Sequence, residues 1–186
     1  MKEKIIFIYC QPISSLLSLT AIILLSWTII CLTKNRYWVA ANHLFVPFAM
    51  IAILLATVAY RVSGGEHGSY PIPLDKLQRA LIQPEYYREM FMNCLLFVPF
   101  GMTFPYLFSE KRGSPARVIL TVSAALILSA LIELLQYCLN IGSFETDDIL
   151  CNAFGALVGS SHLLAASLLR LIIGFFAGIV KGKDRQ

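Results

Sequence analysis

Five long apolar runs constrain the fold of this chain more than any other feature. A run of about 20 residues spans roughly 30 Å of hydrocarbon as a helix. The polar residues fall between the runs, not at helical spacing among the apolar ones. Because no water satisfies backbone polar groups inside a bilayer, the spans must be helical. We therefore expect an all-α, polytopic integral membrane helical bundle with about five transmembrane helices. The expected helices cover approximately Ser14–Thr33, Trp38–Tyr60, Met90–Phe108, Arg117–Leu139 and Ile149–Leu169.

The overall composition agrees with a membrane protein. Of the 186 residues, 58% are apolar and 14% are charged, whereas soluble domains carry roughly 25% charged residues. The net charge of +4 gives no reason to expect a nucleic acid partner. Lys and Arg lie at the ends of the runs, where they set topology and contact lipid headgroups. We therefore expect membrane lipids as partners and no nucleic acid.

The runs divide the chain into four parts. They are two N-terminal transmembrane helices (1–60), a long polar loop (61–89), a core of three transmembrane helices (90–170) and an apolar, then basic C-terminal tail (171–186). In the long loop, Leu74–Ile82 has helix-like spacing, which fits a short helix on the membrane surface, a packed lid or a plain connector. Because Arg170 interrupts the last run, the tail either extends the fifth helix or lies along the interface.

The distribution of positive charge predicts an orientation. Nine Lys and Arg lie on the face of the first loop, third loop and C-terminus, and six lie on the other face. The positive-inside rule then places the N-terminus, the long loop and the acidic loop (Glu145–Asp148) outside the cell. Lys2 and Lys4 argue the other way. No small-x-small cleavage site follows them, so we expect the first helix to be retained.

Polar side chains gather at one end of the last three spans. Glu133 lies within an apolar run, and a carboxylate there is a functional-site hypothesis because its burial is costly. Gln136 follows on the same helix face. Since consecutive spans are antiparallel, the polar residues of all three spans lie on one side of the membrane. The candidate ligand-binding residues are Asn93, Glu133, Gln136, Asp147, Asp148 and Asn152.

Four further residues are expected to shape the helices. Gly155 and Gly159 continue the helix face that carries Asp148 and Asn152, and small residues let another membrane helix approach closely. Pro99 removes a backbone hydrogen bond and predicts a kink, and Gly101 relieves crowding there. The kink either opens room beside Asn93 or serves packing alone.

The acidic residues also have structural interpretations. Asp147 and Asp148 suit the positive N-terminal end of a helix that Thr146 caps. Glu133 can hydrogen-bond to a neighbouring helix. Catalytic residues are not identified, although Glu133 and Asp148 are the candidates. Carboxylates with an amide can hold Mg²⁺ or Ca²⁺, and paired carboxylates can perform acid–base chemistry. Neither spacing is specific, so we assign no metal ligand and expect no cofactor.

Cysteine and histidine patterns do not indicate a second kind of site. The cysteines show no CxxC spacing, so we expect small buried side chains rather than disulfides or zinc ligands. They are Cys10, Cys31, Cys94, Cys138 and Cys151. We interpret His162 as a core residue.

These motifs together resemble the VanZ-like family of small bacterial membrane proteins, named for a teicoplanin-resistance protein. The similarity covers roughly Tyr70 to Gly159. The matching pieces are Asn93 with Phe97–Gly101, Glu133–Gln136, and Asp147–Gly155 with Gly159.

The chain departs from the family pattern at three places. Family members usually carry an arginine just before the acidic loop, where this chain reads Gly142-Ser143-Phe144. A basic residue of the long loop, such as Arg79 or Arg88, is the expected substitute. The first family aspartate is Glu145 here, and an upstream family stretch is reduced to Pro71–Leu74.

The resemblance implies a multi-pass protein of the bacterial cell membrane, linked in some members to glycopeptide resistance. The leading hypothesis is a protein with no evident enzymatic activity that acts in resistance or envelope homeostasis. It would bind an amphiphile, such as a lipid-linked cell-wall precursor or a lipoglycopeptide, at the extracytoplasmic polar cluster. One alternative is a membrane enzyme acting on a lipid headgroup, with Glu133 as acid or base and Asp147 and Asp148 holding a cation. An ion-coupled transporter is the weaker alternative.

Overall fold

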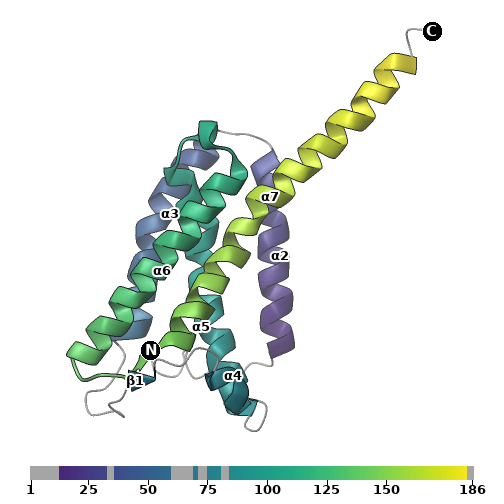
Figure 1. Cartoon of the computed structure of the whole chain (residues 1–186). Coiled ribbons are helices and arrows are strands. Elements are labelled where there is room, and N and C mark those ends of the chain that lie inside the picture. Colours follow the sequence, from purple (N-terminus) through teal and green to yellow (C-terminus); the bar gives the residue numbers. More distant parts are fainter. Residues whose placement is uncertain (1–12, 33–35, 60–68, 71–74, 81–83, 184–186) are drawn as a thin grey trace.

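The computed structural model describes residues 13–32, 36–59, 69–70, 75–80 and 84–183. Five of its helices are long and apolar enough to cross a membrane. Figure 1 shows them as a bundle, which confirms the expected all-α membrane fold. Lys2, Lys4, Cys10 and the Pro71–Leu74 stretch lie outside the described residues.

The membrane helices follow the apolar runs, with short elements between them. The long helices are α2 (Ile13–Leu32), α3 (Arg36–Leu54), α5 (Pro84–Thr103), α6 (Ser114–Cys138) and α7 (Thr146–Lys183). A π-helical turn, η1 (Leu55–Ala59), continues α3, and the 3₁₀ turns η2 (Phe104–Leu107) and η3 (Glu110–Arg112) follow α5. The remaining elements are β1 (Ser69–Tyr70), α4 (Asp75–Ala80) and β2 (Phe144–Glu145).

The last helix, α7, packs against α5, α6 and α2 and so holds the bundle together. It has 38 residues, which corresponds to about 57 Å at the usual helical rise. The helix continues through Arg170 and past the expected end at Leu169. Figure 1 shows its C-terminal part extending beyond the other helices. The apolar part of the tail therefore extends the fifth helix.

Glycines allow α5 and α7 to touch through their backbones. A Cβ atom added at Gly155 would overlap the carbonyl of Cys94, and one at Gly159 would overlap the carbonyl of Val98. Gly101 of α5 lies equally close to the carbonyl of Ala156. Small residues permit such contact between membrane helices.

Pro99 lies inside α5 with its ring exposed. Beside it is an apolar cleft of about 240 Å³ between α3 and α5. The cleft is lined by Ala49, Ala52, Met92, Leu95, Leu96 and Pro99. Asn93 is not among the residues that line this cleft.

The corner between α6 and α7 attaches the long loop to the bundle. Asn140 has a left-handed backbone conformation, with φ of 57°, and the Ile141 N–H donates to the carbonyl of Gln136 at 3.0 Å. β2 then pairs in parallel with β1, with Glu145 opposite Tyr70. α4 packs against α5 and α7. The described part of the loop therefore covers the end of the bundle where α7 begins.

His162 is a buried, hydrogen-bonded core residue of α7. Its Nδ1 lies 2.8 Å from the carbonyl of Gly159. Because a carbonyl only accepts, Nδ1 carries the proton. The Tyr106 hydroxyl lies 3.1 Å from Nε2 and donates to it. The histidine thereby fixes the ring of Tyr106 at the far end of the bundle.

Candidate functional site

A partly buried ion-pair network, centred on Lys76, lies at the α6–α7 corner. The ammonium of Lys76 lies 2.8 Å from Oδ1 of Asp148 and 2.5 Å from Oε2 of Glu145. Glu89 of α5 lies 3.8 Å from the same ammonium. The backbone N–H of Lys76 donates to Oδ2 of Asp147 at 2.6 Å. One residue of α4 therefore joins both aspartates that open α7, across 71 and 72 positions of sequence.

Glu133 joins this network from α6. Its side chain is buried, and its Oε2 accepts the backbone N–H of Glu145 at 3.1 Å. Glu133 is five residues before the end of α6, which places it roughly 8 Å from that end. The carboxyl group therefore lies near one end of the span. We call Lys76, Glu89, Glu133, Glu145, Asp147 and Asp148 the Lys76 network.

Two buried amides link helices beside the network. Nδ2 of Asn152 donates to Oγ of Ser129 at 2.7 Å, joining α7 to α6. Nε2 of Gln136 donates to the carbonyl of Thr57 at 2.9 Å, joining α6 to η1. The amide oxygens of Asn152 and Gln136 are buried with no hydrogen-bond partner among the described residues. Since such an acceptor costs about 1–3 kcal/mol, each favours a donor that reaches it.

Asn93 is the candidate residue that the network does not include. It is half-buried on α5, and within the described part of the chain its side chain forms no hydrogen bond. The structure thus joins Glu133, Asp147 and Asp148 in one network, through Lys76 and the backbone of Glu145. Gln136 and Asn152 form separate contacts between helices.

Lys76 is the residue that the sequence did not identify. A basic residue of the long loop, such as Arg79 or Arg88, was expected to replace the family arginine, and Lys76 of this loop pairs with Glu145 and Asp148. Its place on the expected short helix, on the same side of the membrane as the acids, was the available signal. Sequence spacing carries no information on a pairing this distant.

Charge and burial act against each other at this site. Burial alone would lower the pKa of Lys76, but the charge of Asp148 and hydrogen bonds to Asp148 and Glu145 outweigh it. The pKa of Lys76 therefore lies above its usual 10.5, and the ammonium is charged at neutral pH. Burial raises the pKa of Glu145 above 4.5, although Lys76 opposes this shift.

Three carboxylates of the Lys76 network pair with an ammonium. Among the residues that the structure describes, no group of three or more His, Cys, Asp or Glu side chains is placed to hold a metal ion. The Lys76 ammonium lies between the carboxylates of Asp148 and Glu145.

Cys94 and Cys151 are free thiols in contact across α5 and α7.

Comparison with known proteins agrees with this architecture. The VanZ/LLP1 family model matches residues 15–170, which includes the first two membrane helices as well as the Tyr70–Gly159 stretch. Over 101 residues the chain is 30% identical to protein VanZ of Enterococcus faecium. That alignment covers 50% of this chain and 58% of the relative, less than two thirds of its length. No solved structure is significantly similar. The chain belongs to the VanZ/LLP1 family.

Proposed function

We propose that this multi-pass membrane protein contributes to glycopeptide resistance of the teicoplanin type, or to envelope homeostasis, by binding an amphiphile at the Lys76 network. Membership of the VanZ/LLP1 family supports the link to resistance. The observation that carries the binding role is the partly buried network itself. A lysine from α4 holds Asp148 and Glu145 at the end of a membrane bundle, where polar groups and lipid-facing helices meet.

The chemistry of the site favours a ligand that donates hydrogen bonds. Of the five carboxyl groups in the network, Glu89, Glu145 and Asp148 pair with the one ammonium. Asp147 and Glu133 accept backbone N–H groups. The amide oxygens of Asn152 and Gln136 add two buried acceptors that have no hydrogen-bond partner among the described residues. Sugar hydroxyls and amines donate to such acceptors, whereas a pyrophosphate is repelled by the carboxylates. A lipoglycopeptide therefore fits the site better than a lipid-linked pyrophosphate precursor.

The position at the end of the bundle suits an amphiphile. A ligand can place its polar part at the network and its acyl chain along the exposed apolar faces of α6 and α7. Leu134, Leu150 and Phe154 are exposed on these faces. The positive-inside count supports an extracytoplasmic position, the side on which a drug or cell-wall precursor is encountered.

Expression in a susceptible Gram-positive host tests this proposal. The minimal inhibitory concentration of teicoplanin is compared for the wild type, Lys76→Gln, Asp148→Asn and Lys111→Gln. Lys111 is an exposed lysine on η3, at the opposite end of the bundle, and serves as the matched control. We expect the control to confer full resistance and both network variants to lose it. Membrane abundance is quantified for each strain, and full resistance with Asp148→Asn at equal abundance contradicts the proposal.

A further inference from the structure

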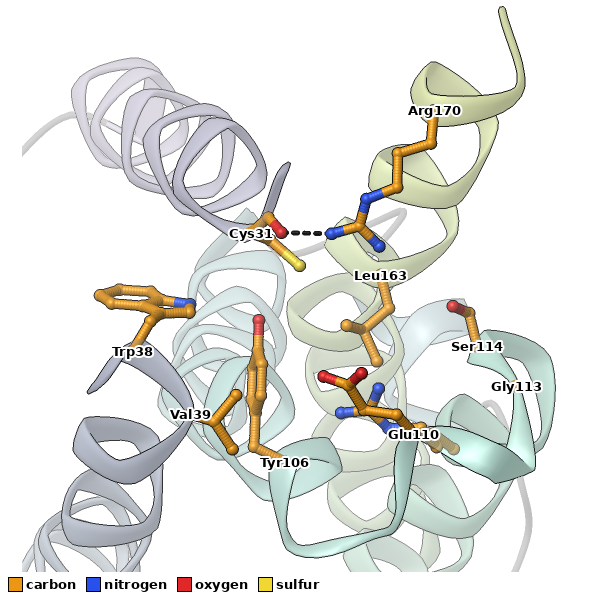
Figure 2. Close-up of a pocket in the computed structure, with 10 residues that line it drawn as sticks. Cys31, Trp38, Val39, Tyr106, Glu110, Gly113, Ser114, Leu163 and Arg170 are labelled. Carbon is orange, nitrogen blue, oxygen red and sulfur yellow. Dashed lines mark hydrogen bonds between the residues drawn. The ribbon is translucent and has the colours of Figure 1, made fainter. Parts of the chain in front are cut away.

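A second polar pocket lies at the other end of the bundle. It has a volume of about 200 Å³ and is formed where α2 ends and α3 and α6 begin, beside α7 (Figure 2). It shares no residue with the Lys76 network. Its polar lining includes Trp38, Tyr106, Glu110, Arg117 and Arg170.

Arg117 brings a buried positive charge to this pocket. The residue is only 6% exposed, and arginine is almost never that buried unless it is paired. Its Nε donates to the carbonyl of Pro105 at 2.9 Å, and its guanidinium lies 5.4 Å from the ring centroid of Tyr106. Within the described part of the chain, no carboxylate forms an ion pair with it. A buried charge without a counterion favours an anionic ligand.

Arg170 brings a second guanidinium from α7. One terminal nitrogen donates to the carbonyl of Cys31 at the end of α2, as Figure 2 shows. Its Nε is buried and has no hydrogen-bond partner among the described residues. Arg170 therefore brings to the pocket a buried donor that an acceptor of a ligand can satisfy.

The charge around the pocket is positive overall. Glu110 is the carboxylate in its lining, and this residue is exposed. Lys111 and Arg112, both exposed, follow it in η3. Because water screens an exposed carboxylate far more than a buried guanidinium, Glu110 opposes an anion only weakly.

We infer that this pocket binds a phosphate ester through Arg117 and Arg170. A guanidinium matches phosphate oxygens with two parallel N–H donors. Basic pockets between membrane helices recognise phosphate headgroups in this way. Next to Arg170, α7 continues as an exposed apolar helix that includes Leu171 and Ile172, which offers a path for acyl chains. A lipid headgroup and a soluble phosphate ester share the required chemistry, and the experiment separates them.

Intrinsic fluorescence of the purified full chain reports on this pocket directly. The chain has two tryptophans. Trp38 lines the pocket, and the ring centroid of Trp27 lies 4.5 Å from that of Trp38. The probes are short-chain phosphatidic acid, the matching diacylglycerol without phosphate, and glycerol 3-phosphate, each added in neutral detergent. We expect a saturable change with phosphatidic acid and none with diacylglycerol. A response to phosphatidic acid alone identifies a lipid headgroup, and an equal response to glycerol 3-phosphate identifies a soluble ester.

Variants connect the signal to the arginines. Arg170→Gln is expected to weaken phosphatidic acid binding roughly tenfold or more. Arg170→Lys keeps the charge but loses the planar fork, so its affinity should be intermediate. Arg112→Gln, at an exposed position outside the pocket, is the matched control and should bind as the wild type does. Equal responses to phosphatidic acid and diacylglycerol overturn the inference. The inference is also overturned if Arg170→Gln binds phosphatidic acid with wild-type affinity. If Arg170→Gln does not fold, wild-type affinity of Arg170→Lys for phosphatidic acid overturns it.

Discussion

Replacing Lys76 with Gln removes the ammonium that joins α4 to Asp148 and Glu145. Both carboxylates then remain close together without their shared counterion. Asp148 is only 5% exposed, so water cannot replace the lost partner fully. We expect the variant to be less stable and α4 to detach from the start of α7.

The magnitude follows from the distances and the burial. At 2.8 Å and 2.5 Å, each ion pair contributes about 6 kcal/mol of Coulomb attraction at an effective dielectric constant of about 20. Desolvation cancels several kcal/mol per ion. Removing one partner of a buried pair costs roughly 3–5 kcal/mol. Because the Lys76 and Glu145 side chains keep 14% and 22% exposure, we expect the lower end, about 3 kcal/mol.

Equilibrium unfolding in mixed detergent micelles measures this cost. A double-mutant cycle uses Lys76→Gln, Asp148→Asn and the double variant, with Lys111→Gln as control. The pair should show a coupling energy of about 2 kcal/mol, because the second substitution removes a carboxylate that has already lost its partner. A cost below about 1 kcal/mol for Lys76→Gln, with no coupling to Asp148, would refute this reasoning.

Two further substitutions test other parts of the structure. Gly155→Ala places a methyl group on the carbonyl of Cys94 and should lower the free energy of unfolding by about 1–3 kcal/mol. Gly174→Ala is the control and should leave stability unchanged, because a methyl group there meets nothing within 4 Å. Equal unfolding midpoints for the two variants would contradict this packing. Glu145→Gln tests how protonation of Glu145 is linked to the stability of the fold. Folding raises the pKa of Glu145 above 4.5, so the folded state binds a proton more readily than the unfolded state. The contribution of this carboxyl group to stability therefore rises as pH falls from the raised pKa toward 4.5. Thermal unfolding from pH 7 to 4 should therefore show wild type gaining on Glu145→Gln, and a constant difference would show that the carboxyl is not perturbed.

Hydropathy and topology predicted much of the architecture. The five spans follow from run length, and the position of Glu133, Asp147 and Asp148 at the same end of the bundle follows from antiparallel helices. The length of α7 did not follow, because Arg170 appears as an interruption in a hydropathy pattern. Its long side chain instead reaches the Cys31 carbonyl, and the helix continues unbroken.

Distant pairings were beyond the sequence for a physical reason. A charge pattern shows that Lys76 is basic but not that α4 turns its ammonium toward Asp148. The pocket proposed for a phosphate ester is likewise formed by residues far apart in the sequence, Arg117 and Arg170 among them. The prediction of membrane orientation counted Arg117 among the loop residues, whereas in the structure Arg117 is buried beside Tyr106.

Binding of teicoplanin to the purified protein in nanodiscs measures the proposed role of the Lys76 network most directly. Isothermal titration calorimetry compares wild type, Asp148→Asn and Lys111→Gln, each verified as folded by circular dichroism. Wild type and Lys111→Gln should bind with the same Kd, and Asp148→Asn should bind roughly tenfold or more weakly because a buried acceptor for the ligand is lost. If folded Asp148→Asn binds as tightly as the wild type, or the wild type does not bind, the network is not the ligand site.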